Sequence, residues 1–163
     1  QVGLMAAPGN PLKLQSLRDV AAESARFVNR ELGTGTRVLL DQLIEESQLS
    51  AESLRGYEDV EPSHAAVAAR IASGRADAGL GIQSAAVRQG LSFVPLHVEN
   101  YWLVCLQSAL ETPALQSLRA QLQSPSWSAA LSAIPGYQAH TPGQVKSLKR
   151  VLPWWYPVLL GNN

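Results

Sequence analysis

The residues best suited to chemistry lie in the glycine- and threonine-rich run 29–37. Its two glycines allow positive-φ turns that point successive backbone N–H groups into one concavity, and its threonines and arginines add side-chain donors for an oxyanion. The candidate anion-binding residues of this run are Asn29, Arg30, Gly33, Thr34, Gly35, Thr36 and Arg37. The same pattern is typical of a tight strand-to-helix turn with a threonine cap and surface arginines. It matches neither a Walker loop nor Gly-x-Gly-x-x-Gly.

A second set of donors is predicted at a helix start, where Ser63 can cap the helix and the ring of His64 can donate. We expect both helix starts to lie at the carboxyl edge of the parallel strands, where loops line the binding crevice of open α/β sheets. The histidine could equally be a surface or capping residue. Asp77 could fix a loop by accepting backbone N–H bonds, or it could contact a ligand.

The sequence contains few residue patterns that are typical of catalytic or metal-binding sites. The three histidines, His64, His97 and His140, lack the spacing of metal ligands, and no Gly-x-Ser-x-Gly elbow occurs. Adjacent carboxylates such as Glu45 and Glu46 point in different directions and mark a solvated face. We therefore expect no catalytic residues, no metal site and no cofactor.

A βα repeat between residues 10 and 96 is expected to position these groups. Short apolar runs alternate with segments whose apolar residues recur at helical spacing, and capping residues separate them. The predicted strands are 2–6, 26–29, 76–82 and 91–96, and the predicted helices begin near 17, 36, 63 and 84. Parallel pairing through helical crossovers is the expected outcome.

The pattern changes beyond this block. A longer strand is predicted over 99–106, and with the strand at 2–6 it brackets the repeat; Cys105 is expected to be buried within it. Proline after an N-cap residue predicts helices over about 114–123 and 126–133. The tail carries Trp154 and Trp155, whose rings could pack on another surface or a partner.

Composition limits the functional classes. The chain has 163 residues, 46% of them hydrophobic, with 13 basic and 13 acidic side chains, which fits one domain and gives no electrostatic warrant for nonspecific nucleic-acid binding. The acidic residues all precede position 112, whereas the remainder holds only basic charges. No apolar stretch is long enough to span a bilayer, so we expect no membrane insertion, and the first residues do not resemble a signal peptide.

Several segments carry a family resemblance when taken in order. They are 29–41, Gly56-Tyr57, Glu61 with 63–68, 76–82, and Phe93 with Pro95-Leu96, Glu99 and Tyr101. Together they resemble the periplasmic-binding-protein-like (type 2) domain, which is attached to molybdate-type helix-turn-helix regulators and to molybdopterin biosynthesis proteins and is related to the binding proteins of molybdate importers. The resemblance covers about residues 1–140. Three departures are Ser63 in place of threonine, no tyrosine after Ile82, and Trp102 in place of a polar residue.

The resemblance implies a two-lobed α/β fold that closes on a small ligand. It assigns residues 9–98 to a complete three-layer α/β/α lobe, and 1–8 with 99–163 to the hinge strands and the C-terminal part of the other lobe, with hinges near Ala7 and Val98. It also adds Glu99 and Tyr101 to the candidate ligand-binding residues.

The function implied by the resemblance is non-catalytic binding of a small oxyanion such as molybdate or tungstate. The domain would be the sensor of a cytoplasmic transcriptional regulator or molybdenum-cofactor protein, and DNA would be contacted only through an attached domain. One alternative is the soluble binding component of an importer, which would be periplasmic if the gene encodes a signal peptide. Others are a lobe of an enzyme built on this fold, or an interaction fragment that forms a homodimer through residues 106–163.

Overall fold

The structure is a computed structural model that describes residues 1–152. The chain divides into two compact units, and each is considered by itself. The first consists of residues 1–102 together with 134–137, and the second holds residues 103–133 and those from 138 onward.

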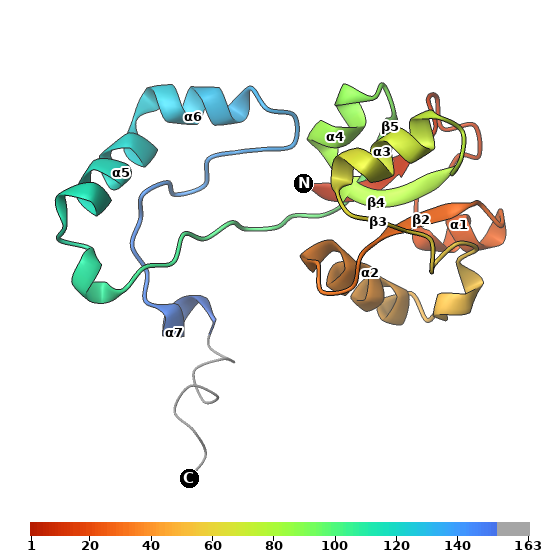
Figure 1. Cartoon of the computed structure of the whole chain (residues 1–163), viewed down its shortest axis with the longest axis horizontal. Helices are drawn as coiled ribbons and strands as arrows, with labels where there is room; N and C mark the ends of the chain where they lie inside the picture. Colours follow the sequence, from red (N-terminus) through yellow and green to blue (C-terminus); the bar gives the residue numbers. More distant parts are fainter. Residues whose placement is uncertain (153–163) are drawn as a thin grey trace, which may run out of the picture. The chain divides into compact units, whose positions relative to one another are not determined.

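A five-stranded sheet forms the centre of the first unit (Figure 1). Its strands are β1 (Val2–Ala6), β2 (Phe27–Arg30), β3 (Val60–Glu61), β4 (Ala78–Ile82) and β5 (Ser92–His97), in the order β3-β2-β4-β1-β5. Strand β2 pairs in parallel with β3 and β4, as expected, whereas β1 runs antiparallel to both β4 and β5. The carboxyl ends of β2, β3, β4 and β5 therefore share one edge.

Helices cover both faces of this sheet. Helices α1 (Leu17–Ala22) and α2 (Gly35–Glu46) pack on one face, and α3 (His64–Ala72) and α4 (Gln83–Arg88) pack on the other (Figure 1). Successive strand residues face opposite layers, so Phe27 packs with α1 and α2 while Val28 packs with α3 and α4. The predicted three-layer α/β/α lobe is confirmed.

Local capping chemistry sets where these helices begin. The side chains of Ser16, Thr34 and Ser63 each accept a hydrogen bond from the backbone N–H three residues onward. These bonds satisfy a donor that the first helical turn would otherwise leave open. The predicted starts of the first three helices are therefore correct to within a residue or two. A short 3₁₀ turn, η1 (Ala51–Ser53), follows Ser50.

The second unit consists of short helices. They are η2 (Gln107–Ala109), α5 (Pro113–Gln123), α6 (Pro125–Ser132) and α7 (Leu148–Val151). Proline opens α5 and α6, as predicted. Within the described part of the chain, no residue after Leu91 is buried, so this unit has no core of its own there. None of the helices in residues 1–152 is both long and apolar enough to cross a membrane.

The predicted strand over 99–106 is wrong. Strand β5 ends at His97, and residues 98–106 adopt no regular structure. Within residues 1–152, β5 is the edge of the sheet and pairs only with β1. A strand beyond His97 would need a further neighbour to complete its hydrogen bonds. Cys105 is exposed instead of buried for the same reason. The two tryptophans of the predicted tail lie outside the described residues.

The close approach of β4 to its neighbours gives a test of this fold. A Cβ added at Gly79 would lie 2.6 Å from the Val28 carbonyl oxygen and 2.8 Å from Cγ1 of Val67. We expect Gly79→Ala to lower the free energy of unfolding by about 1–3 kcal/mol, measured by urea denaturation, because the backbone cannot yield without shifting the sheet.

Gly35→Ala is the matched control, since an added Cβ there meets nothing within 4 Å. Its free energy of unfolding should stay within about 0.5 kcal/mol of wild type or rise. Equal losses in the two variants would contradict the packing described for β4.

Candidate functional site

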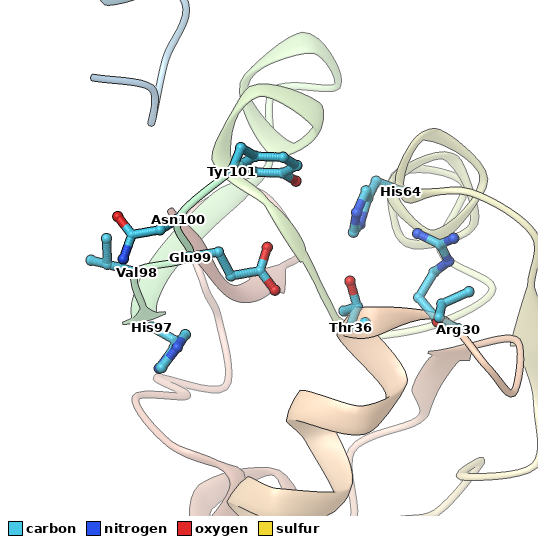
Figure 2. A pocket seen from close by; sticks show the side chains of 10 residues that line it. Arg30, Thr36, His64, His97, Val98, Glu99, Asn100 and Tyr101 are labelled. Carbon is cyan, nitrogen blue, oxygen red and sulfur yellow. The ribbon is translucent and has the colours of Figure 1, made fainter. Parts of the chain in front are cut away.

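A pocket of about 590 Å³ opens at the carboxyl edge of the sheet. It is formed by the loops that follow β2, β3 and β5, so the topology alone brings these segments together. Its lining residues are Arg30, Thr34, Gly35, Thr36, His64, His97, Val98, Glu99, Asn100 and Tyr101 (Figure 2).

Arg30 is the buried cation of the pocket. It is the last residue of β2 and only 9% of its surface is exposed. Its Nη2 donates to the Pro62 carbonyl oxygen at 3.0 Å, whereas Nε is buried without a hydrogen-bond partner. Burying a guanidinium whose N–H groups lack acceptors lowers the stability of the folded protein, and a bound acceptor removes this penalty. Arg30 therefore retains a buried donor that is free to bond an acceptor.

The N-termini of α2 and α3 open into the same pocket. The backbone N–H groups of Gly35 and Thr36 lie in the first turn of α2, and those of His64 and Ala65 lie in the first turn of α3; within residues 1–152 none of them has a hydrogen-bond acceptor. Such free N–H groups and the positive ends of the helix dipoles favour an anion. The Thr36 side chain, which is buried, lines the pocket between them.

His64 adds a neutral ring beside this cation. Burial of the ring, and then the charge of Arg30, lower its pKa from 6.5 to about 4. Its Nδ1 is buried and has no partner in the described structure. At neutral pH the imidazole therefore offers hydrogen bonding without adding a second positive charge.

Residues 97–101 form the opposite wall. Figure 2 shows the Glu99 carboxylate directed into the space between this segment and Thr36. The ring of Tyr101 stacks on that of Tyr137 with centroids 6.5 Å apart. Burial, followed by the charge of Glu99, raises the pKa of the Tyr101 hydroxyl. The pocket thus has a cationic side and a carboxylate side.

Seven of the residues predicted from the sequence line this pocket: Arg30, Thr34, Gly35, Thr36, His64, Glu99 and Tyr101. Gly33 and Ser63 lie beside it and serve local structure. Gly33 takes a φ of 84°, which suits glycine, and Ser63 caps α3.

The structure places the other predicted residues in internal contacts. The Asn29 amide donates to the Tyr57 carbonyl oxygen at 3.0 Å, and its side-chain oxygen accepts from the Arg30 N–H at 2.8 Å. The Arg37 guanidinium lies 4.2 Å from the centre of the Tyr57 ring and pairs with Asp41 at 3.2 Å. Asn29 and Arg37 therefore support the turn and do not line the pocket.

Asp77 lies at the opposite end of the parallel strands. Its carboxylate pairs with the Arg26 guanidinium at 2.6 Å and accepts the Arg26 backbone N–H at 2.8 Å. The hydrogen bonds from Arg26 hold the pKa of Asp77 below its usual value. Of the two roles considered for Asp77, this geometry favours the structural one, because the pair joins the starts of β2 and β4.

Sequence reasoning missed the pocket residues His97, Val98 and Asn100. The usable signal was their position, since they follow a predicted strand whose carboxyl end faces the same edge as the glycine-threonine turn. Within residues 1–152, no group of three or more side chains is arranged to hold a metal ion.

Comparison with known proteins gives a family and several relatives. A family profile described as "PBP superfamily domain" matches residues 1–123. The uncharacterized protein YvgK of Bacillus subtilis is 35% identical over 145 residues, which is 89% of this chain and 46% of that protein. An uncharacterized Clostridium pasteurianum protein, encoded in the 5′ region of a 2Fe-2S ferredoxin gene, is 28% identical over 66% of this chain and 96% of its own length. The chain thus spans about half the length of YvgK.

Two solved structures share the fold. One is an ancestral arginine-binding protein bound to arginine, with a TM-score of 0.53 and 16% identity, covering 83% of this chain and 60% of that one. The other is an ancestral arginine-binding protein bound to glutamine, with a TM-score of 0.51 and 14% identity, covering 83% and 59%. At these identities the likeness concerns the fold alone.

The environment of His64 predicts a pH dependence. A histidine whose pKa is lowered by folding binds its proton more readily in the unfolded chain, so stability falls as the pH drops from 6.5 toward 4. Allowing for its partial exposure, we expect this loss to be about 1–2 kcal/mol and to be absent in His64→Gln. Urea denaturation of both proteins between pH 7 and pH 4.5 measures this loss of stability. Equal losses in the wild type and in His64→Gln would contradict the assignment of the loss to His64.

Proposed function

This chain belongs to the PBP superfamily, and from that premise we propose that its pocket binds a small ligand through an anionic group. The proposed role is binding without catalysis. The ligand's negative charge would be held by Arg30, by Thr36 and by the free N–H groups at the starts of α2 and α3. The loop Thr34–Gly35 completes this side of the pocket.

The observation that carries this proposal is the unused hydrogen-bonding capacity of Arg30. Its Nε is buried without a partner, in a residue only 9% exposed, beside two open helix N-termini. Charge-assisted hydrogen bonds to an anion would satisfy these donors together, and each is worth about 1.5–3 kcal/mol. The neutral ring of His64 supports the same proposal, because it adds hydrogen bonding without charge repulsion toward Arg30.

The finer proposal is a sensor module. The resemblance to domains attached to molybdate-type regulators and molybdopterin proteins favours an oxyanion such as molybdate or tungstate, and a role in cytoplasmic regulation or cofactor synthesis. Any contact with DNA would come from a domain attached to this one. The alternative to a sensor module is the soluble ligand-binding component of an importer. Two solved structures of the same fold are ligand-binding proteins, which is compatible with this alternative.

The proposal also covers how the chain divides between two lobes and whether copies of it associate. We propose that residues 9–98 form one lobe, that the hinge strand in residues 1–8 enters its sheet as β1, and that residues 99–163 contribute to another lobe. An association between copies through residues 106–163 also stays a prediction, which light scattering of the purified chain tests directly.

Anion binding is tested with a panel of ligands and one conservative variant. Isothermal titration and thermal shifts with molybdate, tungstate, sulfate, arginine and glutamine should identify at least one ligand. We expect Arg30→Lys to weaken its binding by about tenfold or more, because the ammonium lacks the guanidinium fork.

Arg88→Lys is the matched control, since Arg88 lies in the last turn of α4 and does not line the pocket. Its dissociation constant should stay within about twofold of wild type. The proposal fails if no member of the panel binds, or if the two variants weaken binding equally.

A further inference from the structure

We infer that Tyr57 is a positioning residue of the pocket. It holds the start of α2 in place relative to the end of β2 and to the loop that leads into α3, and it thereby sets the affinity for an anion. The inference rests on the proposed function, because it concerns the alignment of the groups assigned to the anion. It gives a role in binding to a residue that does not line the pocket.

The groups assigned to the anion come from elements on opposite faces of the sheet. Helices α2 and α3 pack on different faces (Figure 1), and Arg30 ends a strand of the sheet between them. Several donors bind one ligand at full strength only when each is held within about 0.5 Å of its productive position. The pocket therefore needs contacts that hold the start of α2 against the segment leading into α3.

The side chain of Tyr57 contacts the first two turns of α2. Its hydroxyl donates to Oδ1 of Asp41 at 2.7 Å, and the centre of its ring lies 4.2 Å from the buried Arg37 guanidinium. Nε of Arg37 donates to the same Asp41 oxygen at 3.2 Å, so the three side chains contact one another. The hydrogen bond to Asp41 raises the pKa of Tyr57, which keeps the hydroxyl a donor at neutral pH.

The backbone of Tyr57 is held at the end of β2. Its carbonyl oxygen accepts from the Asn29 side-chain amide at 3.0 Å, and the Asn29 backbone N–H donates to the Asp59 carbonyl oxygen at 2.7 Å. Asn29 is buried, and its side-chain oxygen accepts the backbone N–H of Arg30 at 2.8 Å. The Arg30 guanidinium in turn donates to the carbonyl oxygen of Pro62, just before α3. Tyr57 thus joins α2 to the segment that carries the other anion-binding groups.

The loop side of this connection is constrained by Gly56. This residue takes a φ of 95°, and a Cβ added to it would collide with the Phe27 carbonyl oxygen, so the loop lies directly against β2. The Phe27 N–H also donates to the Arg55 carbonyl oxygen at 2.7 Å. Because the loop is held along β2, loss of the Tyr57 hydroxyl releases the start of α2 and leaves the loop in place.

Tyr57→Phe tests this inference on the full chain, because it removes the hydroxyl and keeps the ring beside Arg37. The probe is the tightest-binding member of the panel molybdate, tungstate, sulfate, arginine and glutamine. By isothermal titration at pH 7 we expect Tyr57→Phe to weaken its binding by about threefold to tenfold, the range of one lost hydrogen bond. Circular dichroism establishes that each variant is folded at the temperature of the titration.

Gln42→Ala is the matched control. It removes a hydrogen bond of 2.7 Å to Glu46 on the exposed face of the same helix and touches neither Tyr57 nor Asp41 by a hydrogen bond within residues 1–152. Its dissociation constant should stay within about twofold of wild type.

A double-mutant cycle separates positioning from a merely structural role. If Tyr57 acts by aligning α2 with Arg30, the loss caused by Tyr57→Phe should shrink to less than about twofold once Arg30→Lys has removed the guanidinium fork. A general loss of stability produces no such coupling in a dissociation constant. In the free protein, the backbone N–H signals of Gly35 and Thr36 should move in Tyr57→Phe, while the signal of Asp77 stays in place.

The outcomes separate this inference from the proposed function. If no member of the panel binds the wild type, the proposed function fails and this inference falls with it. If the wild type binds and Tyr57→Phe binds as tightly, or no more weakly than Gln42→Ala, the positioning role is overturned while anion binding stands. Equal losses from Tyr57→Phe in the wild type and in Arg30→Lys likewise overturn it.

Discussion

The buried guanidinium of Arg30 is the constraint on which the rest of the pocket depends. Burying a cation is costly unless acceptors surround it, and the described structure supplies one, the Pro62 carbonyl oxygen, while leaving Nε unpaired. The backbone of Arg30 is held at the end of β2 by pairing with Glu61 of β3. Under the proposed function an anionic ligand would supply the missing acceptors, and the neighbouring helix starts and the neutral His64 fit that proposal.

The other charged groups of the first unit show why Arg30 is distinct. Arg26 is committed to Asp77 at the opposite edge of the sheet, and Arg37 is held by Asp41 and the Tyr57 ring. These pairs join strands and brace the turn before α2, so they shape the pocket without lining it. Arg26 and Arg37 are thus engaged in internal contacts, whereas Nε of Arg30 has no partner within residues 1–152.

Much of this fold could be predicted because its signals are local. A serine or threonine that caps the next turn, such as Thr34 or Ser63, marks a helix start within a few residues. A short apolar run likewise marks β1, whose residues are all buried. The glycine-threonine turn could also be predicted, since Gly33 adopts a positive φ and Thr34 caps the helix that follows. Seven predicted residues consequently meet in one pocket.

The wrong predictions concern features that depend on contacts between residues distant in sequence, which local patterns do not reveal. The run from Tyr101 to Leu106 has the composition of a strand, but a strand forms only beside a neighbour, and the sheet ends at β5. Arg37 looked as available as Arg30 because the sequence does not reveal that Asp41 and Tyr57 converge on it. The two-residue strand β3 was likewise too short for any periodic signal.

The most direct test of the central claim is a titration followed by nuclear magnetic resonance. The backbone N–H signals of Gly35, Thr36, His64 and Ala65, together with the Arg30 Nε–H signal, should move together and saturate as a binding anion is added. Signals at the opposite edge, around Arg26 and Asp77, should stay in place. Shifts confined to that opposite edge, or spread evenly over the surface, would contradict the claim that Arg30 and the two helix starts form an anion-binding site.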